Sequence, residues 1–149
     1  FILHTSGYAS AAAKMRTLYL FTVLTAFVTV LMCQSQADME KLHKLCMNET
    51  NLTEAEIKQF FGNGMKACDA KDNMKCHTKC LMEKQGIIKD GVYVPSVAIK
   101  QLMLFPALKG HETEVTQAVN NCKYEKGANE CDTAFKITMC IKEFKSHAP

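Results

Sequence analysis

Serine is scarce in this sequence, and the residue patterns of common hydrolytic sites are missing. From residue 38 onward the only serines are Ser96 and Ser146. There is no G-x-S-x-G turn, no H-E-x-x-H pair and no His-Asp-Cys-Cys run, so the usual nucleophile and metal arrangements of hydrolases are absent. We therefore expect that the protein is not an enzyme.

The chain also lacks a clustered basic face and a hydrophobic run long enough to span a membrane. From residue 38 onward 16 lysines stand against 15 acidic side chains, and the two signs are interspersed. Nucleic-acid binding needs a basic patch, so we expect no nucleic-acid partner. The one long apolar run, residues 18–32, is shorter than the roughly 20 residues that a membrane helix needs. We expect no membrane span in the mature form.

The apolar run instead has the layout of a secretory signal peptide. Met15 and Arg16 begin it, and small residues precede a cleavage point after Ala37. Residues 1–14 contain no methionine, so we expect translation to start at Met15 and these residues to lie upstream of the protein. We predict a signal peptide over residues 15–37 and a single secreted, extracellular domain over residues 38–149.

Two N-glycosylation sequons, at Asn48 and Asn51, fit a secretory route. They predict a surface loop, although motifs this short also arise by chance. The two asparagines are three residues apart, so we do not expect both to carry a glycan.

Seven of the eight cysteines lie in the predicted domain, so one of them is left without a partner when six pair. Six cysteines allow fifteen connectivities, and spacing does not choose among them. Cys76 and Cys80 lie on one side of a helix, whereas Cys131 and Cys140 lie on opposite sides of one. Metal binding by Cys76, His77 and Cys80 is the alternative. Neighbouring residues point about 100° apart and secretion favours disulfides, so we expect no metal and no cofactor.

Apolar periodicity predicts an all-α fold of about six helices. They cover residues 39–47, a segment capped by Thr53 with Glu56 and ended by Gly62 and Gly64, residues 72–85 with Asp72 as N-cap, a segment from Pro95 to Pro106, a segment with Glu112 and Glu114 at its start and an apolar stripe from Val115 to Cys122, and residues 130–145. The last helix is apolar nearly all round, which predicts that it is central and that the other five surround it. The turn signal Asp90-Gly91 permits a hairpin, but an isolated two-stranded ribbon is marginal, so we expect residues 87–94 to form an ordered loop.

The cysteine ladder resembles that of the insect odorant-binding protein family, the six-cysteine carriers of pheromones and general odorants. The ladder runs Cys46, 29 residues, Cys76, three, Cys80, 41, Cys122, eight, Cys131, eight, Cys140. Residues 79–91 are also similar to the stretch after the family's third cysteine. The resemblance implies three bridges: Cys46 with Cys80, Cys76 with Cys131, and Cys122 with Cys140. Cys68 departs from the pattern, and we expect it to be a buried free thiol.

The resemblance further implies a carrier that holds small hydrophobic ligands, such as odorants or pheromones, in an internal apolar pocket and transports them through aqueous fluid. A membrane odorant receptor would be an indirect partner, and we expect a monomer or a weak homodimer. The candidate ligand-binding residues are Phe60, Phe61, Leu81, Tyr93, Ile99, Met103, Val119, Phe135, Met139 and Phe144. Each is otherwise an ordinary core residue, because core and pocket share one composition.

The sequence leaves two alternative functions open. The same fold can serve as a non-olfactory carrier or scavenger in haemolymph, saliva or reproductive fluid, and no residue separates that role from olfaction. A saposin-like membrane-active protein also has helices and six cysteines, but a different cysteine spacing is expected there.

Overall fold

The computed structural model describes Tyr19 and residues 38–146. Contacts divide the chain into two units, Phe1–Lys41 and Leu42–Pro149. In the first unit, Tyr19 and residues 38–41 are helical; apart from Tyr19, the predicted signal peptide and residues 1–14 lie outside the described residues. Among the residues that are described, no helix is long and apolar enough to cross a membrane.

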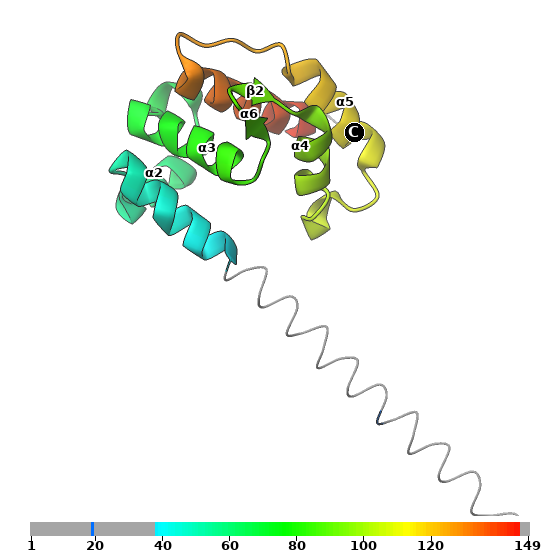
Figure 1. Ribbon diagram of the computed structural model, residues 1–149, viewed down its shortest axis with the longest axis horizontal. Helices are drawn as coiled ribbons and strands as arrows, with labels where there is room; N and C mark the ends of the chain where they lie inside the picture. The colour runs from blue at the N-terminus through cyan, green and yellow to red at the C-terminus, as the bar shows by residue number, and fades with distance from the viewer. Residues whose placement is uncertain (1–18, 20–37, 147–149) are drawn as a thin grey trace, which may run out of the picture. The chain divides into compact units, whose positions relative to one another are not determined.

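The second unit is mainly helical, as Figure 1 shows. Its elements are residues 42–50 of a first helix, α2 (Glu54–Gly62), the 3-10 helix η1 (Ala67–Asp69), α3 (Asp72–Lys84), β1 (Ile88–Lys89), β2 (Val92–Tyr93), α4 (Pro95–Leu102), the 3-10 helix η2 (Pro106–Leu108), α5 (Glu112–Cys122) and α6 (Glu130–Ser146). The predicted all-α fold with about six helices is confirmed.

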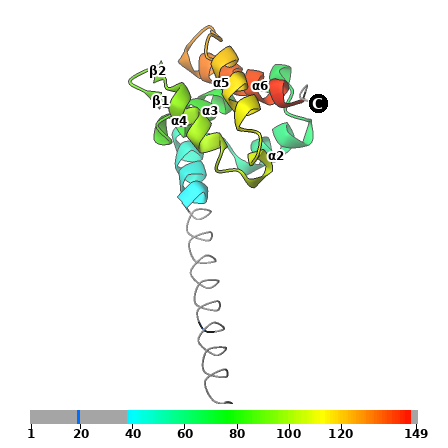
Figure 2. The same ribbon diagram turned by 90° about the vertical axis from the view of Figure 1, so that its right-hand side faces the viewer.

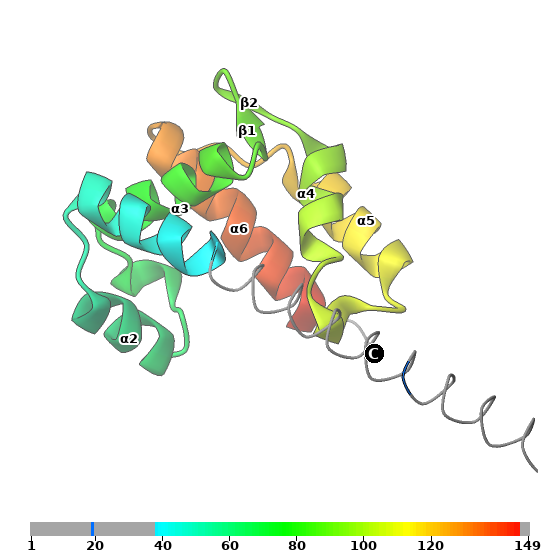
Figure 3. The same cartoon turned by 60° about the horizontal axis from the view of Figure 1, so that its bottom comes forward.

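The last helix, α6, packs against α3 on one side and α5 on another, and α2 and α4 lie at opposite ends of this arrangement (Figure 3). Disulfides fix both contacts: Cys76–Cys131 joins α3 to α6, and Cys122–Cys140 joins α5 to α6. The predicted apolar character of α6 on several sides agrees with its burial, since residues 134, 135, 137 and 139 are all buried. Its central position follows from this pattern.

The first helix is joined to α3 by Cys46–Cys80. One turn before these cysteines, His43 and His77 meet, with 3.3 Å between His43 Nδ1 and His77 Nε2. His77 is 4% exposed, and burial, together with the neighbouring His43, lowers its pKa. A neutral His77 is therefore part of the packed interface between the two helices.

Residues 88–93 form a short antiparallel hairpin, so the predicted loop is wrong in its detail. Ile88 pairs with Tyr93 and Lys89 with Val92, around Asp90 and Gly91, which both have positive φ (51° and 77°). Two positive φ angles give the turn the twist that a two-residue hairpin needs. The hairpin is not isolated, because β1 lies against α3 (Figure 2).

Helix α4 ends at Leu102, earlier than the predicted end at Pro106. Phe105 is extended (φ −75°, ψ 122°) and 55% exposed. The ring of a proline disfavours helical backbone at the residue before it, so Pro106 keeps Phe105 out of the helical conformation. The capping box of Thr53 and Glu56 at the start of α2 is confirmed, whereas α3 begins at Asp72 itself, with Lys71 at the N-cap position.

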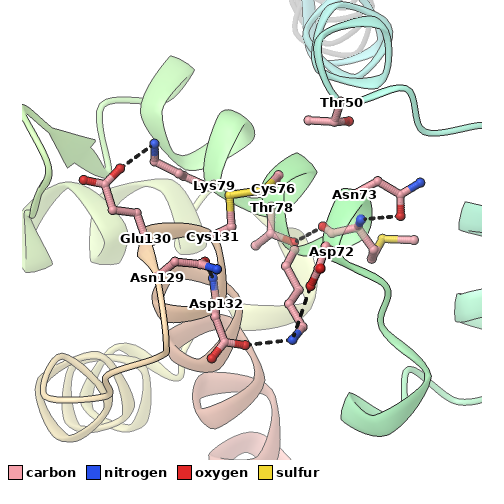
Figure 4. The surroundings of a disulfide bond; sticks show 12 residues. Thr50, Asp72, Asn73, Cys76, Thr78, Lys79, Asn129, Glu130, Cys131 and Asp132 are labelled. Atoms are coloured by element: carbon pink, nitrogen blue, oxygen red, sulfur yellow. Dashed lines mark hydrogen bonds and ion pairs between the residues drawn. A yellow bond between two sulfur atoms is a disulfide. The ribbon is translucent and has the colours of Figure 1, made fainter.

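Ion pairs flank the α3–α6 disulfide on both sides (Figure 4). Lys75 reaches Asp132 at 2.9 Å, and Lys79 reaches Glu130 at 2.7 Å. The loop before α6 folds back on the helix start: Gly127 N donates to Thr133 Oγ1 at 2.9 Å, and Ala128 N donates to Asp132 Oδ2 at 3.0 Å. The beginning of α6 is thus fixed by a covalent bond, by charges and by the loop that precedes it.

Gly127→Ala should destabilise the protein, because a Cβ there would come within 2.5 Å of the Asp132 and Thr133 backbone. We expect a loss of about 2 kcal/mol in chemical denaturation, as for other overpacked sites. Gly62→Ala is the matched control. Nothing lies within 4 Å of its Cβ at the end of α2, so alanine should be neutral or stabilise by about 0.5 kcal/mol. Equal effects of the two substitutions would contradict the described loop.

The stability should fall on acidification through the titration of His77. Its folded pKa is lowered, so the unfolded chain binds more protons below the ordinary value of 6.5. The contribution of His77 to the free energy of unfolding is fully present above pH 6.5. It decreases as the pH falls toward the lowered pKa. Urea denaturation at pH 7 and pH 5 should show the loss, and His77→Gln should reduce the difference between the two pH values even if it lowers both stabilities. An unchanged difference would exclude His77 as its source.

Candidate functional site

Two apolar clusters lie on either side of α6. The larger, here the α4–α5 cluster, combines α3, α4, α5, α6 and the hairpin. Its buried members are Met82, Ile87, Ala98, Val115, Val119, Ala134 and Ile137. Partly buried side chains of α4 and the hairpin, including Tyr93, Ile99 and Met103, pack against it. This cluster is the larger apolar region in the described part of the fold.

The smaller group, here the α2 cluster, joins α2 and α3 to the other side of α6. It consists of Leu52, Phe60, Met74, Phe135 and Met139. The Phe60 and Phe135 rings are 6.1 Å apart at their centroids. Phe135 and Met139 are four residues apart, which places them together on one face of α6, away from Ala134 and Ile137.

The structure divides the predicted ligand-binding residues between these clusters. Tyr93, Ile99, Met103 and Val119 belong to the α4–α5 cluster, and Phe60, Phe135 and Met139 to the α2 cluster. Leu81, Phe61 and Phe144 are in neither, and Phe61 is 57% exposed. Within the described part of the chain, only the α4–α5 cluster contains a buried polar side chain that lacks a hydrogen-bond partner.

That side chain is Tyr93, on β2. Its hydroxyl is buried and has no hydrogen-bond partner in the described structure, and burial raises its pKa to about 12. No charged group contributes to that shift. The hydroxyl of Thr138 on α6, by contrast, donates to the Ala134 carbonyl at 3.0 Å. Tyr93 therefore carries a buried, neutral hydroxyl without a hydrogen-bond partner among the described residues.

A cavity of about 230 Å³ opens elsewhere, between α2, η1 and the start of α3. It is lined by Leu52, Glu56, Gln59, Phe60, Asn63, Asp69, Lys71, Asn73 and Met74. Of the predicted ligand-binding residues only Phe60 is among them. No pattern in the sequence pointed to the other lining residues, because the polar groups come from segments that are separated along the chain and meet only in the fold.

The three disulfides of the structure join the pairs that the family resemblance implies. Cys68 is the free cysteine of the described chain and is exposed, so the expected burial of its thiol is wrong. It lies in η1, which contains no buried residue. Asn48 and Asn51 are both exposed, but Asn48 lies in the first helix and only Asn51 in the turn after it, so the predicted loop is wrong for Asn48.

Comparison with known proteins agrees with this architecture. The model of the PBP/GOBP family matches residues 30–144. General odorant-binding protein 56a of Drosophila melanogaster is 35% identical over 127 residues, covering 85% of this chain and 87% of that protein. The structure of a fatty acid binding protein, OBP56a, from the oral disk of the blowfly Phormia regina has 30% identity and a TM-score of 0.62, covering 77% of this chain and 95% of that one.

The medfly odorant-binding protein CcapOBP22/CcapOBP69a is also similar, with 27% identity and a TM-score of 0.54 over 70% of this chain and 84% of that one. By their names these relatives bind odorants or fatty acids. The family match, the fold and the cysteine ladder agree over nearly all of the described chain. The chain therefore belongs to the PBP/GOBP family of insect odorant-binding proteins.

Proposed function

We propose that this protein is a secreted carrier that binds a small apolar molecule beside Tyr93 in the α4–α5 cluster and transports it through aqueous fluid. The observation that supports this most directly is the buried, unpartnered Tyr93 hydroxyl in apolar surroundings. Leaving such a group without a hydrogen bond costs about 1–3 kcal/mol. A ligand with a polar head would remove that cost by accepting or donating at this hydroxyl.

The surroundings of Tyr93 favour a neutral head group. Burial alone raises its pKa, and no cation contributes, so an ionised carboxylate would be desolvated there without a partner charge. An alcohol, aldehyde or ester fits this chemistry better. The tail would lie among the partly buried side chains of α4 and its C-cap, where Ile99 and Met103 offer apolar and adaptable contacts.

The blowfly relative supports a second candidate, a carrier of fatty acids in an oral fluid rather than of odorants in an olfactory one. In the site described here a fatty acid would bind in its protonated form. Both candidates share the apolar tail, and they differ in the head group and in the tissue where the protein is made. A comparison of transcript levels in antennae and mouthparts distinguishes the tissues.

Removing the hydroxyl should stabilise the protein without ligand. Tyr93→Phe eliminates an unpaired buried polar group and keeps the ring, so we expect the free energy of unfolding to rise by about 1 kcal/mol. Tyr124→Phe is the matched control, because Tyr124 is 73% exposed and its hydroxyl can reach water, so its effect should stay within about 0.5 kcal/mol. Urea denaturation of both variants checks this. Destabilisation by Tyr93→Phe alone would show that its hydroxyl has a partner.

The same substitution should weaken the binding of ligands that have a polar head. For a long-chain alcohol we expect Tyr93→Phe to lower the affinity about threefold to tenfold, the value of one hydrogen bond, and to leave an alkane of equal length unaffected. Displacement of a fluorescent apolar probe measures both, with Tyr124→Phe as control. A fatty acid titrated at pH 5 and pH 8 tests the second candidate. Equal losses for alcohol and alkane would argue against Tyr93 as the anchor.

A further inference from the structure

The cavity between α2, η1 and α3 has a lining unlike that of either apolar cluster. Its apolar part consists of Leu52, Phe60 and Met74, which all belong to the α2 cluster and are buried. The rest of the wall is polar. Three amide side chains contribute to it, from Gln59, Asn63 and Asn73. A small molecule in this cavity would therefore meet an apolar surface on one side and hydrogen-bonding groups on another.

The charged groups of the wall are two carboxylates and one ammonium group, from Glu56, Asp69 and Lys71. The carboxylate of Glu56 accepts hydrogen bonds from Thr53 N and Oγ1 at Oε2, and it holds Lys71 Nζ at 3.2 Å from Oε1. These bonds lower the pKa of Glu56 to about 2, so it is ionised at physiological pH.

The Asp69 carboxylate is less engaged. Its side chain accepts one hydrogen bond within the described chain, from the Cys68 thiol at 3.7 Å from Oδ1. With Lys71 already paired to Glu56, the wall of the cavity has one negative charge that is not neutralised. Charge complementarity therefore favours a cation over an anion or a neutral molecule.

We propose that this cavity is a second binding site, which takes a small organic ammonium ion with an apolar body. The ammonium group would lie between Asp69 and Glu56, and the body against Phe60 and Met74. The aromatic ring of Phe60 adds a surface that is favourable to cations as well as to apolar groups. The volume of about 230 Å³ is below the usual size of pockets for drug-sized ligands, which limits the guest to a small amine.

Calorimetric titration of the secreted protein with phenethylammonium chloride tests the proposal, with phenethyl alcohol as the neutral molecule of the same shape. We expect Asp69→Asn and Glu56→Gln each to weaken binding of the ammonium ion about threefold to tenfold. Glutamine keeps the capping box, so Glu56→Gln should fold. Lys71→Gln should strengthen binding, because it frees the Glu56 carboxylate.

Matched controls are available on the same segments. Glu54→Gln changes a neighbouring carboxylate in the first turn of α2, and Asp72→Asn changes one that is 96% exposed; neither residue lines the cavity, and neither substitution should alter binding. The ammonium ion should also bind equally to Tyr93→Phe and should leave the apolar probe in place, which separates this site from the proposed carrier site. No detectable binding, equal affinity for Asp69→Asn and Asp72→Asn, or displacement of the apolar probe would each overturn the proposal.

Discussion

The burial of α6 on two opposite sides is the constraint on which the rest of this structure depends. Ala134 and Ile137 face one cluster and Phe135 and Met139 the other, so the helix must be covered from both directions. Such a helix can be central only if its neighbours are held against it. The bridges to α3 and α5 do this covalently for two of the neighbouring helices.

The disulfides also offset features of the interior that lower the free energy of unfolding. The three bridges join cysteines that are 34, 55 and 18 residues apart, and each bridge of this kind contributes about 2–4 kcal/mol, mainly by restricting the unfolded chain. The disulfides make this contribution even when some buried polar groups lack hydrogen-bond partners. A buried phenol without a partner at Tyr93 and a buried neutral imidazole at His77 can both be retained in a domain of this size.

Local signals in the sequence predicted the local structure well. The capping box at Thr53, the two-sided pattern of α6 and the cysteine ladder depend on residues near one another or on fixed spacing, and periodicity expresses these directly. The division of the predicted ligand-binding residues between two clusters did not follow from the sequence, because residues of one composition join different clusters according to how the helices pack. The cavity was missed for a related reason: Glu56 and Asn73 are 17 residues apart and meet only in the fold. Cys68 shows a further limit, since its exposure depends on a short 3-10 helix that has no periodicity to detect.

Selectivity in the proposed carrier should come from the head of the ligand more than from its tail. Each methylene of a tail adds only about 0.8 kcal/mol, and adaptable side chains such as Met103 accept tails of different length. The Tyr93 hydroxyl differs from these adaptable contacts, because the hairpin fixes its position before a ligand arrives. The free energy cost of burying it is already present in the protein without ligand. A polar head at the right place recovers that cost, whereas a head without hydrogen-bonding capacity leaves it in full. The energetic contrast between two ligands of equal size is therefore largest at this one atom.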